Sequence, residues 1–169
     1  DIGSLAVYGT CNDLAVCGGR PRFLSVGMVL EEGLPLADLE TIAESIRAAS
    51  EETGVSVVTG DTKVVPRGKG GGIYINTSGI GEVAADHPLG LERIVSGDRV
   101  IVSGPVGTHG IALLAARENL HPGAELRSDA ASLFPLCEKL YGLGREVRFM
   151  RDATRGGIAA VCNEMVSRR

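Results

Sequence analysis

Residues 57–65, VVTGDTKVV, interrupt a run of β-branched residues with a carboxylate, a hydroxyl and an ammonium group. Asp61 supplies hard oxygen ligands of the kind that Mg²⁺ prefers, Thr62 supplies a hydroxyl, and Lys63 supplies a positive charge suited to phosphate. We expect the strand to end here, so that a turn brings the three side chains toward one ligand. The alternative is an Asp–Lys ion pair in a surface turn, worth at most about 1 kcal/mol.

A second polar pair, Asn12 and Asp13, interrupts an otherwise apolar segment. A carboxylate buried in such a segment needs a charged partner or a cation, because an unpaired buried charge is strongly unfavourable. An amphipathic helix with Asp13 on its solvent-exposed face explains the pair equally well.

A third motif, DATRGG at residues 152–157, directly precedes a helical pattern. Backbone N–H groups at the start of that helix, together with Arg155, would form an anion site. The alternative is an ordinary N-cap, with Asp152 or Thr154 closing the helix and Gly156 easing the turn. His109 also lies in a loop before a helix, where capping or packing is its commoner role.

Hydrophobic periodicity and turn residues predict the elements that position these motifs. Residues 3–18 are compatible with a helix or a strand, of which a helix is favoured. A helix is predicted over residues 36–53, opened by Pro35 and stopped by Gly54. Strands are predicted over residues 23–32, 55–60 and 73–83, the last after a glycine-rich loop.

A domain boundary is predicted near residues 96–98, because a fresh apolar strand pattern follows at residues 99–104. Further helices are predicted at residues 111–120, 133–142 and 158–166, and a strand at residues 145–150. The alternation of strands and helices indicates an α/β or α+β fold. The predicted domains are residues 1–97 and 98–169.

Composition narrows the class of protein. The chain has 169 residues, a formal net charge of −4 and only six aromatic residues, so nucleic-acid binding is disfavoured. No apolar run approaches the roughly 18 residues that a membrane helix needs. The four cysteines show no metal-ligand spacing, which is typical of free thiols in a reducing cytoplasm.

The motifs and their order resemble the HypE family of hydrogenase maturation proteins, within the AIR synthase-related (PurM-like) superfamily. The resemblance covers essentially the whole chain and includes NDLA, GGRP, VTGDTKVVPRGKG, INTSGIG, SGPVGTHGIALLAAREN and RDATRGGIA. It implies an α/β N-terminal domain that forms a shared β-barrel in a homodimer. It also implies that a second α+β domain follows, of which residues 98–169 are a part.

The resemblance implies an activity as well. HypE-like proteins use ATP and Mg²⁺ to dehydrate a carbamoyl group on the thiol of a C-terminal cysteine. The product is a thiocyanate, the source of the cyanide ligands on the iron of [NiFe] hydrogenase. The implied partners are the HypF carbamoyltransferase and the HypC–HypD complex.

The resemblance also suggests a role for each motif. Asp13 and Asp61 would bind Mg²⁺, and Asp61 and Lys63 would be catalytic, Lys63 neutralising charge on the transferred phosphoryl group. Asn12 and Thr62 would orient these aspartate and lysine side chains. The implied nucleotide-binding residues are Asn12, Asp13, Asp61, Thr62, Lys63, Asp152, Thr154, Arg155 and Gly156.

The chain departs from the family pattern in four places. The acidic N-terminal segment and the C-terminal cysteine tail have no counterpart among these residues, Thr108 stands where aspartate is common, and Gly70-Gly71 replaces a more varied pair. We therefore expect this polypeptide alone to be inactive. Two alternatives stay open: an ATP-dependent small-molecule synthetase or kinase of the same superfamily, such as AIR synthase or selenophosphate synthetase, and a non-catalytic dimeric assembly module.

Overall fold

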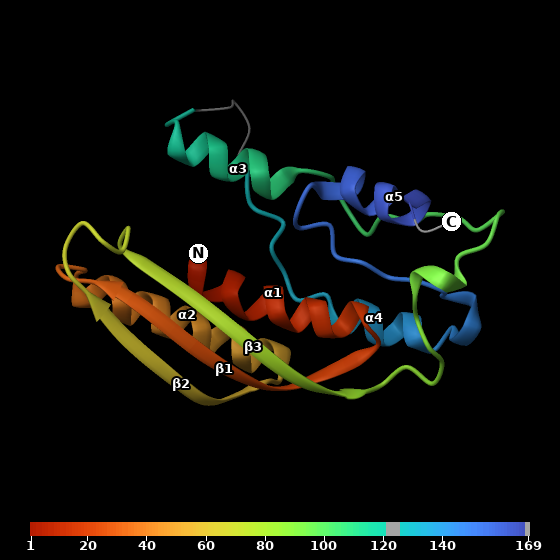
Figure 1. The fold of residues 1–169 in the computed structure, drawn as a ribbon, viewed down its shortest axis with the longest axis horizontal. Helices are drawn as coiled ribbons and strands as arrows, with labels where there is room; N and C mark the ends of the chain where they lie inside the picture. The colour runs from red at the N-terminus through yellow and green to blue at the C-terminus, as the bar shows by residue number, and fades with distance from the viewer. Residues whose placement is uncertain (121–125, 168–169) are drawn as a thin grey trace.

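The fold was derived from a computed structural model, which describes residues 1–120 and 126–167. Two helices lie on one face of a three-stranded sheet in the first half of the chain (Figure 1). In chain order the elements are α1 (Ile2–Val16), β1 (Gly19–Glu31), α2 (Leu36–Thr53), β2 (Ser56–Val65) and β3 (Ile73–Val83). The predicted helices and strands of this half are therefore confirmed, apart from the end of the second strand. Gly54 ends α2 with a φ of 68°, a left-handed conformation that favours glycine.

The strand order of the sheet is β2-β1-β3. β1 and β2 run parallel, because the 18-residue helix α2 carries the chain back to the starting edge. β3 pairs antiparallel with β1. Within the described residues, β2 pairs with β1 alone and is an edge strand.

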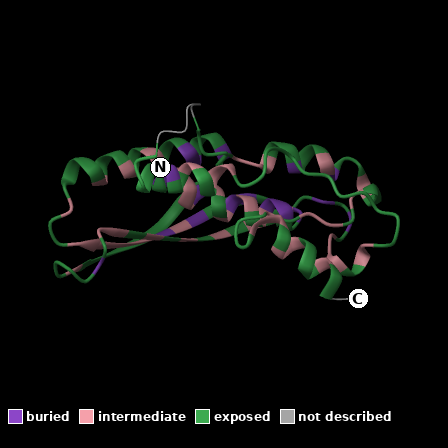
Figure 2. Cartoon of the chain, turned by 90° about the horizontal axis from the view of Figure 1, so that it is seen from above, coloured by how far each residue is buried: buried purple, intermediate pink, exposed green. Residues whose placement is uncertain are grey.

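The first apolar core lies between the sheet and the two helices, and Figure 2 shows buried positions concentrated in the interior. α1 approaches β3 closely at Gly79, where a Cβ atom would lie 2.7 Å from Thr10 Cγ2 and 2.9 Å from Leu14 Cδ1. The buried members of this core are Val7, Cys11, Leu24, Val26, Ile46, Ala49 and Val55.

The second half of the chain contributes helices and no strand within the described residues. Figure 1 shows α4 beside the C-terminal end of α1, with α3 and α5 further from the sheet. The elements are η1 (Leu91–Arg93), α3 (Thr108–Arg117), α4 (Phe134–Tyr141), η2 (Gly144–Glu146) and α5 (Gly157–Ser167). The three predicted helices of this half are confirmed. None of the described helices is both long enough and apolar enough to cross a bilayer.

Two predicted strands are wrong. Residues 99–104 are irregular, and residues 145–150 begin in η2 and continue without regular structure. An extended segment becomes a strand only when a neighbour accepts and donates its backbone hydrogen bonds. Among the described residues neither segment has such a neighbour, although both have the apolar composition of a strand.

The predicted end of the second strand is also wrong. β2 does not stop at the Asp61 motif but continues to Val65. Its pairing with β1 continues through the motif, with Gly27 opposite Asp61 and Val29 opposite Lys63. This pairing keeps the strand extended. Residues 61–63, which we call the DTK motif, are therefore part of the paired strand and not of a turn.

Candidate functional site

The structure brings two of the predicted site residues into contact, Asp13 near the end of α1 and Asp152 in the loop before α5. Asp13 is an exposed residue, but desolvation by its neighbours raises the pKa of its carboxyl group, and the negative charge and shared hydrogen bond of Asp152 raise it further. Arg151 and Arg155 act in the opposite direction on the same carboxyl group. The chain thus joins NDLA and RDATRGG, two motifs almost 140 residues apart in sequence.

The loop before α5 holds Asp152 in place. The Thr154 hydroxyl donates a hydrogen bond of 2.6 Å to Asp152 Oδ2. Arg151 lies 4.0 Å from Asp152 Oδ1 and 3.4 Å from Glu164 on α5. Sequence reasoning did not single out Arg151, although its position directly before Asp152 was a usable signal.

The Asp13–Asp152 pair fits a magnesium ion. Carboxylate oxygens are suitable ligands for Mg²⁺, which proteins commonly bind through one or two carboxylates together with water and substrate phosphates. The raised pKa of Asp13 shows that the two arginines do not fully offset the desolvation and the like charge. No cluster of three or more His, Cys, Asp or Glu side chains occurs in the described part of the chain, so the two carboxylates would need phosphate or water as further ligands.

The DTK motif lies elsewhere, on the sheet. Asp61 and Lys63 share the register of Gly27 and Val29, so their side chains lie on the sheet face opposite the helices. We call this surface the bare face. Thr62 alternates to the other face, and its backbone N–H donates a hydrogen bond of 2.8 Å to Asp61 Oδ1. The predicted convergence of the three side chains on one point is not seen, because the strand continues.

Within one copy, Asp13 and Asp61 lie on different sides of the sheet. Asp13 belongs to α1, which packs on the face that carries Leu24 and Val26. Asp61 belongs to the bare face, as its register partner Gly27 shows. One copy of the chain therefore pairs Asp13 with Asp152 and does not bring Asp61 to it.

Two further polar residues make structural contacts. The Asn12 amide donates a hydrogen bond of 3.0 Å to the Ala131 carbonyl, and its oxygen accepts one of 2.8 Å from the Leu133 N–H. His109 lies in the first turn of α3, and its Nδ1 is 2.8 Å from the Ser128 hydroxyl. This contact agrees with the capping or packing role weighed for His109.

Glu31, at the end of β1, holds the glycine-rich loop and was missed from the sequence. Its carboxylate accepts hydrogen bonds from the backbone N–H groups of Gly68, Gly70 and Gly72, the last at 2.9 Å. These bonds, that of Gly68 first, lower the pKa of Glu31. A glutamate at the end of a strand has no sequence signature for this role, because the loop that it holds begins 37 residues further along the chain.

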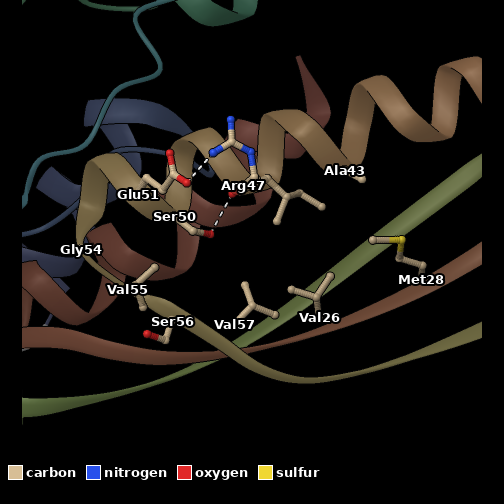
Figure 3. Close-up of a pocket in the computed structure, with 11 residues that line it drawn as sticks. Val26, Met28, Ala43, Arg47, Ser50, Glu51, Gly54, Val55, Ser56 and Val57 are labelled. Atoms are coloured by element: carbon tan, nitrogen blue, oxygen red, sulfur yellow. Dashed lines mark hydrogen bonds and ion pairs between the residues drawn. The ribbon is translucent and has the colours of Figure 1, made fainter.

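A groove of about 460 Å³ lies between α2 and the strands β1 and β2 (Figure 3). Val26, Met28 and Val57 form much of its wall, and Arg47 at its rim is paired with Glu51 and Glu44. None of the predicted site residues lines it. Its apolar wall and paired charges do not suit a nucleotide phosphate.

Comparison with known families covers both halves of the chain. Residues 1–83 match the family described as AIR synthase related protein, N-terminal domain, and residues 95–169 match its C-terminal domain. The chain is 49% identical over 166 residues to a carbamoyl dehydratase HypE of Bradyrhizobium diazoefficiens, covering 98% of this chain and 48% of the relative. This chain is an AIR synthase-related protein of the HypE family.

Solved HypE-family structures superpose closely on the chain. A HypE–HypF complex matches with a TM-score of 0.96 and 44% identity, over 99% of this chain and 55% of that one. A hydrogenase maturation protein HypE in complex with ATP matches with a TM-score of 0.94 and 47% identity, over 98% of this chain and 49% of that one. The mixed α/β PurM-like fold is therefore confirmed. The chain spans about half the length of the HypE-family relatives that it matches.

Proposed function

We propose that this chain supplies the Mg-ATP site of a HypE-type carbamoyl dehydratase in [NiFe] hydrogenase maturation. The observation that carries the proposal is the contact between Asp13 and Asp152, which unites two HypE-family motifs in one acidic site. The solved HypE-family relative with bound ATP supports the nucleotide as ligand.

The reaction converts a carbamoyl group on a C-terminal cysteine thiol into a thiocyanate. The amide oxygen takes the γ-phosphoryl group of ATP and leaves as phosphate, while the nitrogen loses its two protons and a C≡N bond forms. Mg²⁺ neutralises charge on the phosphates when bound. Asp13 and Asp152 would hold it, and Arg155 and the backbone at Gly156 would bind phosphate oxygens at the start of α5.

Asp61 and Lys63 would complete this site from a second copy of the chain. Their strand is an exposed edge, and Asp61 and Lys63 lie on the bare face, away from Asp13 of the same copy. A homodimer built through β2 and the bare face, as a shared barrel, would carry these side chains to the partner. Lys63 would then stabilise charge that develops on the transferred phosphoryl group.

The proposed setting is the cytoplasm, with HypF supplying the carbamoyl group and the HypC–HypD complex receiving the cyanide. The solved complex of a HypE-family relative with HypF supports the first partner. Residues 1–97 would form the ATP-binding and dimerisation domain, and residues 98–169 would belong to the second domain.

The test is thermal melting of the chain with Mg-ATP. Binding at a nucleotide concentration 100 times Kd adds about 2.7 kcal/mol, a rise in Tm of about 5–10 °C for a chain of this size. Asp152→Asn and Asp61→Asn are each expected to abolish the rise. Asp38→Asn, an exposed aspartate at the start of α2, serves as the matched control and should keep it.

Mixing variants tests whether two copies share the site. Asp13→Asn and Asp61→Asn chains, refolded together, should recover about one quarter of the parental ATP sites if each site uses one residue from each copy. No recovery would show that both residues act within one copy. An unchanged Tm of the parent in Mg-ATP favours the non-catalytic module. A nucleotide response without thiocyanate formation by the full-length protein favours the small-molecule synthetase or kinase.

A further inference from the structure

The C-terminal end of α1 is fastened to the second half of the chain through Asn12, the residue before Asp13. Both ends of the Asn12 amide are used, the nitrogen by the Ala131 carbonyl at 3.0 Å and the oxygen by the Leu133 N–H at 2.8 Å. An amide side chain that donates to and accepts from the same backbone segment fixes both its position and its direction. Asn12 is thus turned toward residues 131–133 and not toward an outside ligand.

Tyr141, at the end of α4, makes a second connection between α4 and the C-terminal end of α1. Its hydroxyl donates a hydrogen bond of 2.5 Å to the Ala15 carbonyl and lies 3.3 Å from the Gly19 carbonyl. Burial, aided by the nearby Cys137, raises the pKa of Tyr141 to about 12, so the hydroxyl stays a donor through the neutral range. Asn12 and Tyr141 therefore hold α4 against the last turns of α1.

An apolar cluster between these two contacts extends to the residues that precede Asp152. Met150 packs against this cluster, two residues before Asp152. The chain just before it is also held, because the Val147 carbonyl lies 3.0 Å from His87 Nε2. The buried members of the cluster are Ala15, Val16, Ala85, Cys137 and Tyr141. The location of Asp152 therefore follows from how α4 is docked on α1.

We propose that Asn12 and Tyr141 are positioning residues that hold Asp152 against Asp13. The proposal rests on the proposed function, in which the two carboxylates bind Mg²⁺. We call the contacts of Asn12 and Tyr141 the clamp, and Asn12 is then part of the clamp instead of a nucleotide ligand. Two carboxylates in contact repel each other, so the segment that carries Asp152 must be held in place. Without the clamp, repulsion moves Asp152 away and the metal loses one of its two protein ligands.

The first experiment measures position without any metal. Cys17 and Cys162 are exposed, whereas Cys11 and Cys137 are buried, so spin labels attach selectively near the end of α1 and on α5. The distance distribution between the labels should be narrow in the parent chain. It should broaden in Asn12→Ala and in Tyr141→Phe, and stay narrow in Tyr74→Phe, which removes a hydroxyl from an exposed tyrosine on β3.

The second experiment measures Mn²⁺ affinity by electron paramagnetic resonance. Asn12→Ala and Tyr141→Phe should each weaken binding about tenfold, as the loss of a supporting contact commonly does. In the Asp152→Asn background neither change should weaken it further, since the residue that they position is already lost. A general loss of structure would instead reduce affinity in both backgrounds, and Asn163→Ala on the exposed side of α5 should have no effect.

The two readouts separate this inference from the proposed function. Distributions that are narrow in the parent and broadened in both variants, in a parent chain that binds no Mn²⁺, would retain the clamp and reject the metal site. Unchanged distances and unchanged Mn²⁺ affinity in both variants would overturn the clamp. If Asn12→Ala fails to fold, Tyr141→Phe decides alone, because it keeps the ring that fills the cluster.

Discussion

Asp13 shows how a site is built from opposing electrostatic effects at a single residue. Desolvation by neighbouring groups and the charge of Asp152 favour its neutral form, while Arg151 and Arg155 favour its ionised form. The raised pKa shows that desolvation and like charge prevail. A divalent cation would reverse the balance, since it attracts both carboxylates.

Asp13→Asn is expected to stabilise the metal-free chain near neutral pH. A raised folded-state pKa means that protonation of Asp13 contributes stability below the ordinary carboxyl value of about 4, and that this contribution is lost as pH rises through the raised value. The solvent-screened pair is worth at most about 1 kcal/mol, so Tm should rise by about 2–4 °C at pH 7.

Scanning calorimetry at pH 7 and pH 3 checks this sign. The difference between variant and parent should disappear at pH 3, and Mg²⁺ should raise the Tm of the parent only. Asp38→Asn is the control, because loss of a carboxylate from the first turn of α2 should lower stability slightly. A lower Tm for Asp13→Asn at pH 7 would contradict the like-charge account.

α1, the helix that carries Asp13, packs closely against β3 at Gly79. This contact sets the distance between the helix and the strand. Gly79 leaves room for Thr10, Leu14 and Leu24, whose carbon atoms lie 2.7–3.1 Å from where a Cβ would be. Hydrogen bonds also join β3 to α1. The Thr77 hydroxyl donates a hydrogen bond of 2.9 Å to the Ala6 carbonyl and lies 2.6 Å from Thr10 Oγ1. Glycine is needed here for space and not for an unusual φ.

Gly79→Ala is expected to destabilise the chain by about 1–3 kcal/mol, since overpacking pushes α1 off the sheet. Gly9→Ala is the matched control in the same helix, because nothing lies within 4 Å of its Cβ position. There the loss of glycine should stabilise α1 by about 0.5–1 kcal/mol. Urea denaturation measures both, and equal effects of the two changes would reject the packing explanation.

At the scale of the whole molecule, the described residues cover the sheet on one face only. Tyr74 and Ile80 are exposed on the bare face, opposite Val29 and Phe23 in the register. β3, which carries both side chains, is an edge strand within the described residues, as is β2 on the other side of β1. Exposed apolar side chains next to an open strand edge favour pairing with a second chain.

We expect the chain to be a dimer, measured as twice its monomer mass by light scattering. Ile80→Lys, at a side chain that is 69% exposed, should shift the population to monomer without unfolding it. Leu36→Lys, at an equally exposed leucine at the start of α2, should leave the dimer intact. A monomeric parent, or an Ile80→Lys dimer, would reject this face as the interface.

Most elements could be predicted from the sequence, because they follow from local patterns. The apolar spacing of residues 36–53, the stop at Gly54 and the alternation along residues 73–83 are properties of neighbouring residues. The motifs of the candidate site and their family were readable for the same reason. The strands predicted at residues 99–104 and 145–150 failed because a strand also needs a neighbour, which composition does not specify.

The sequence by itself thus determined the elements, the motifs and the chemical groups that they carry. Only the tertiary structure decided which groups meet. It paired Asp13 with Asp152 and placed Asp61 on the bare face, because β2 continues through the DTK motif and α4 docks on the end of α1. Strand register and helix docking depend on contacts between residues far apart in the chain, and a local pattern contains no information about them.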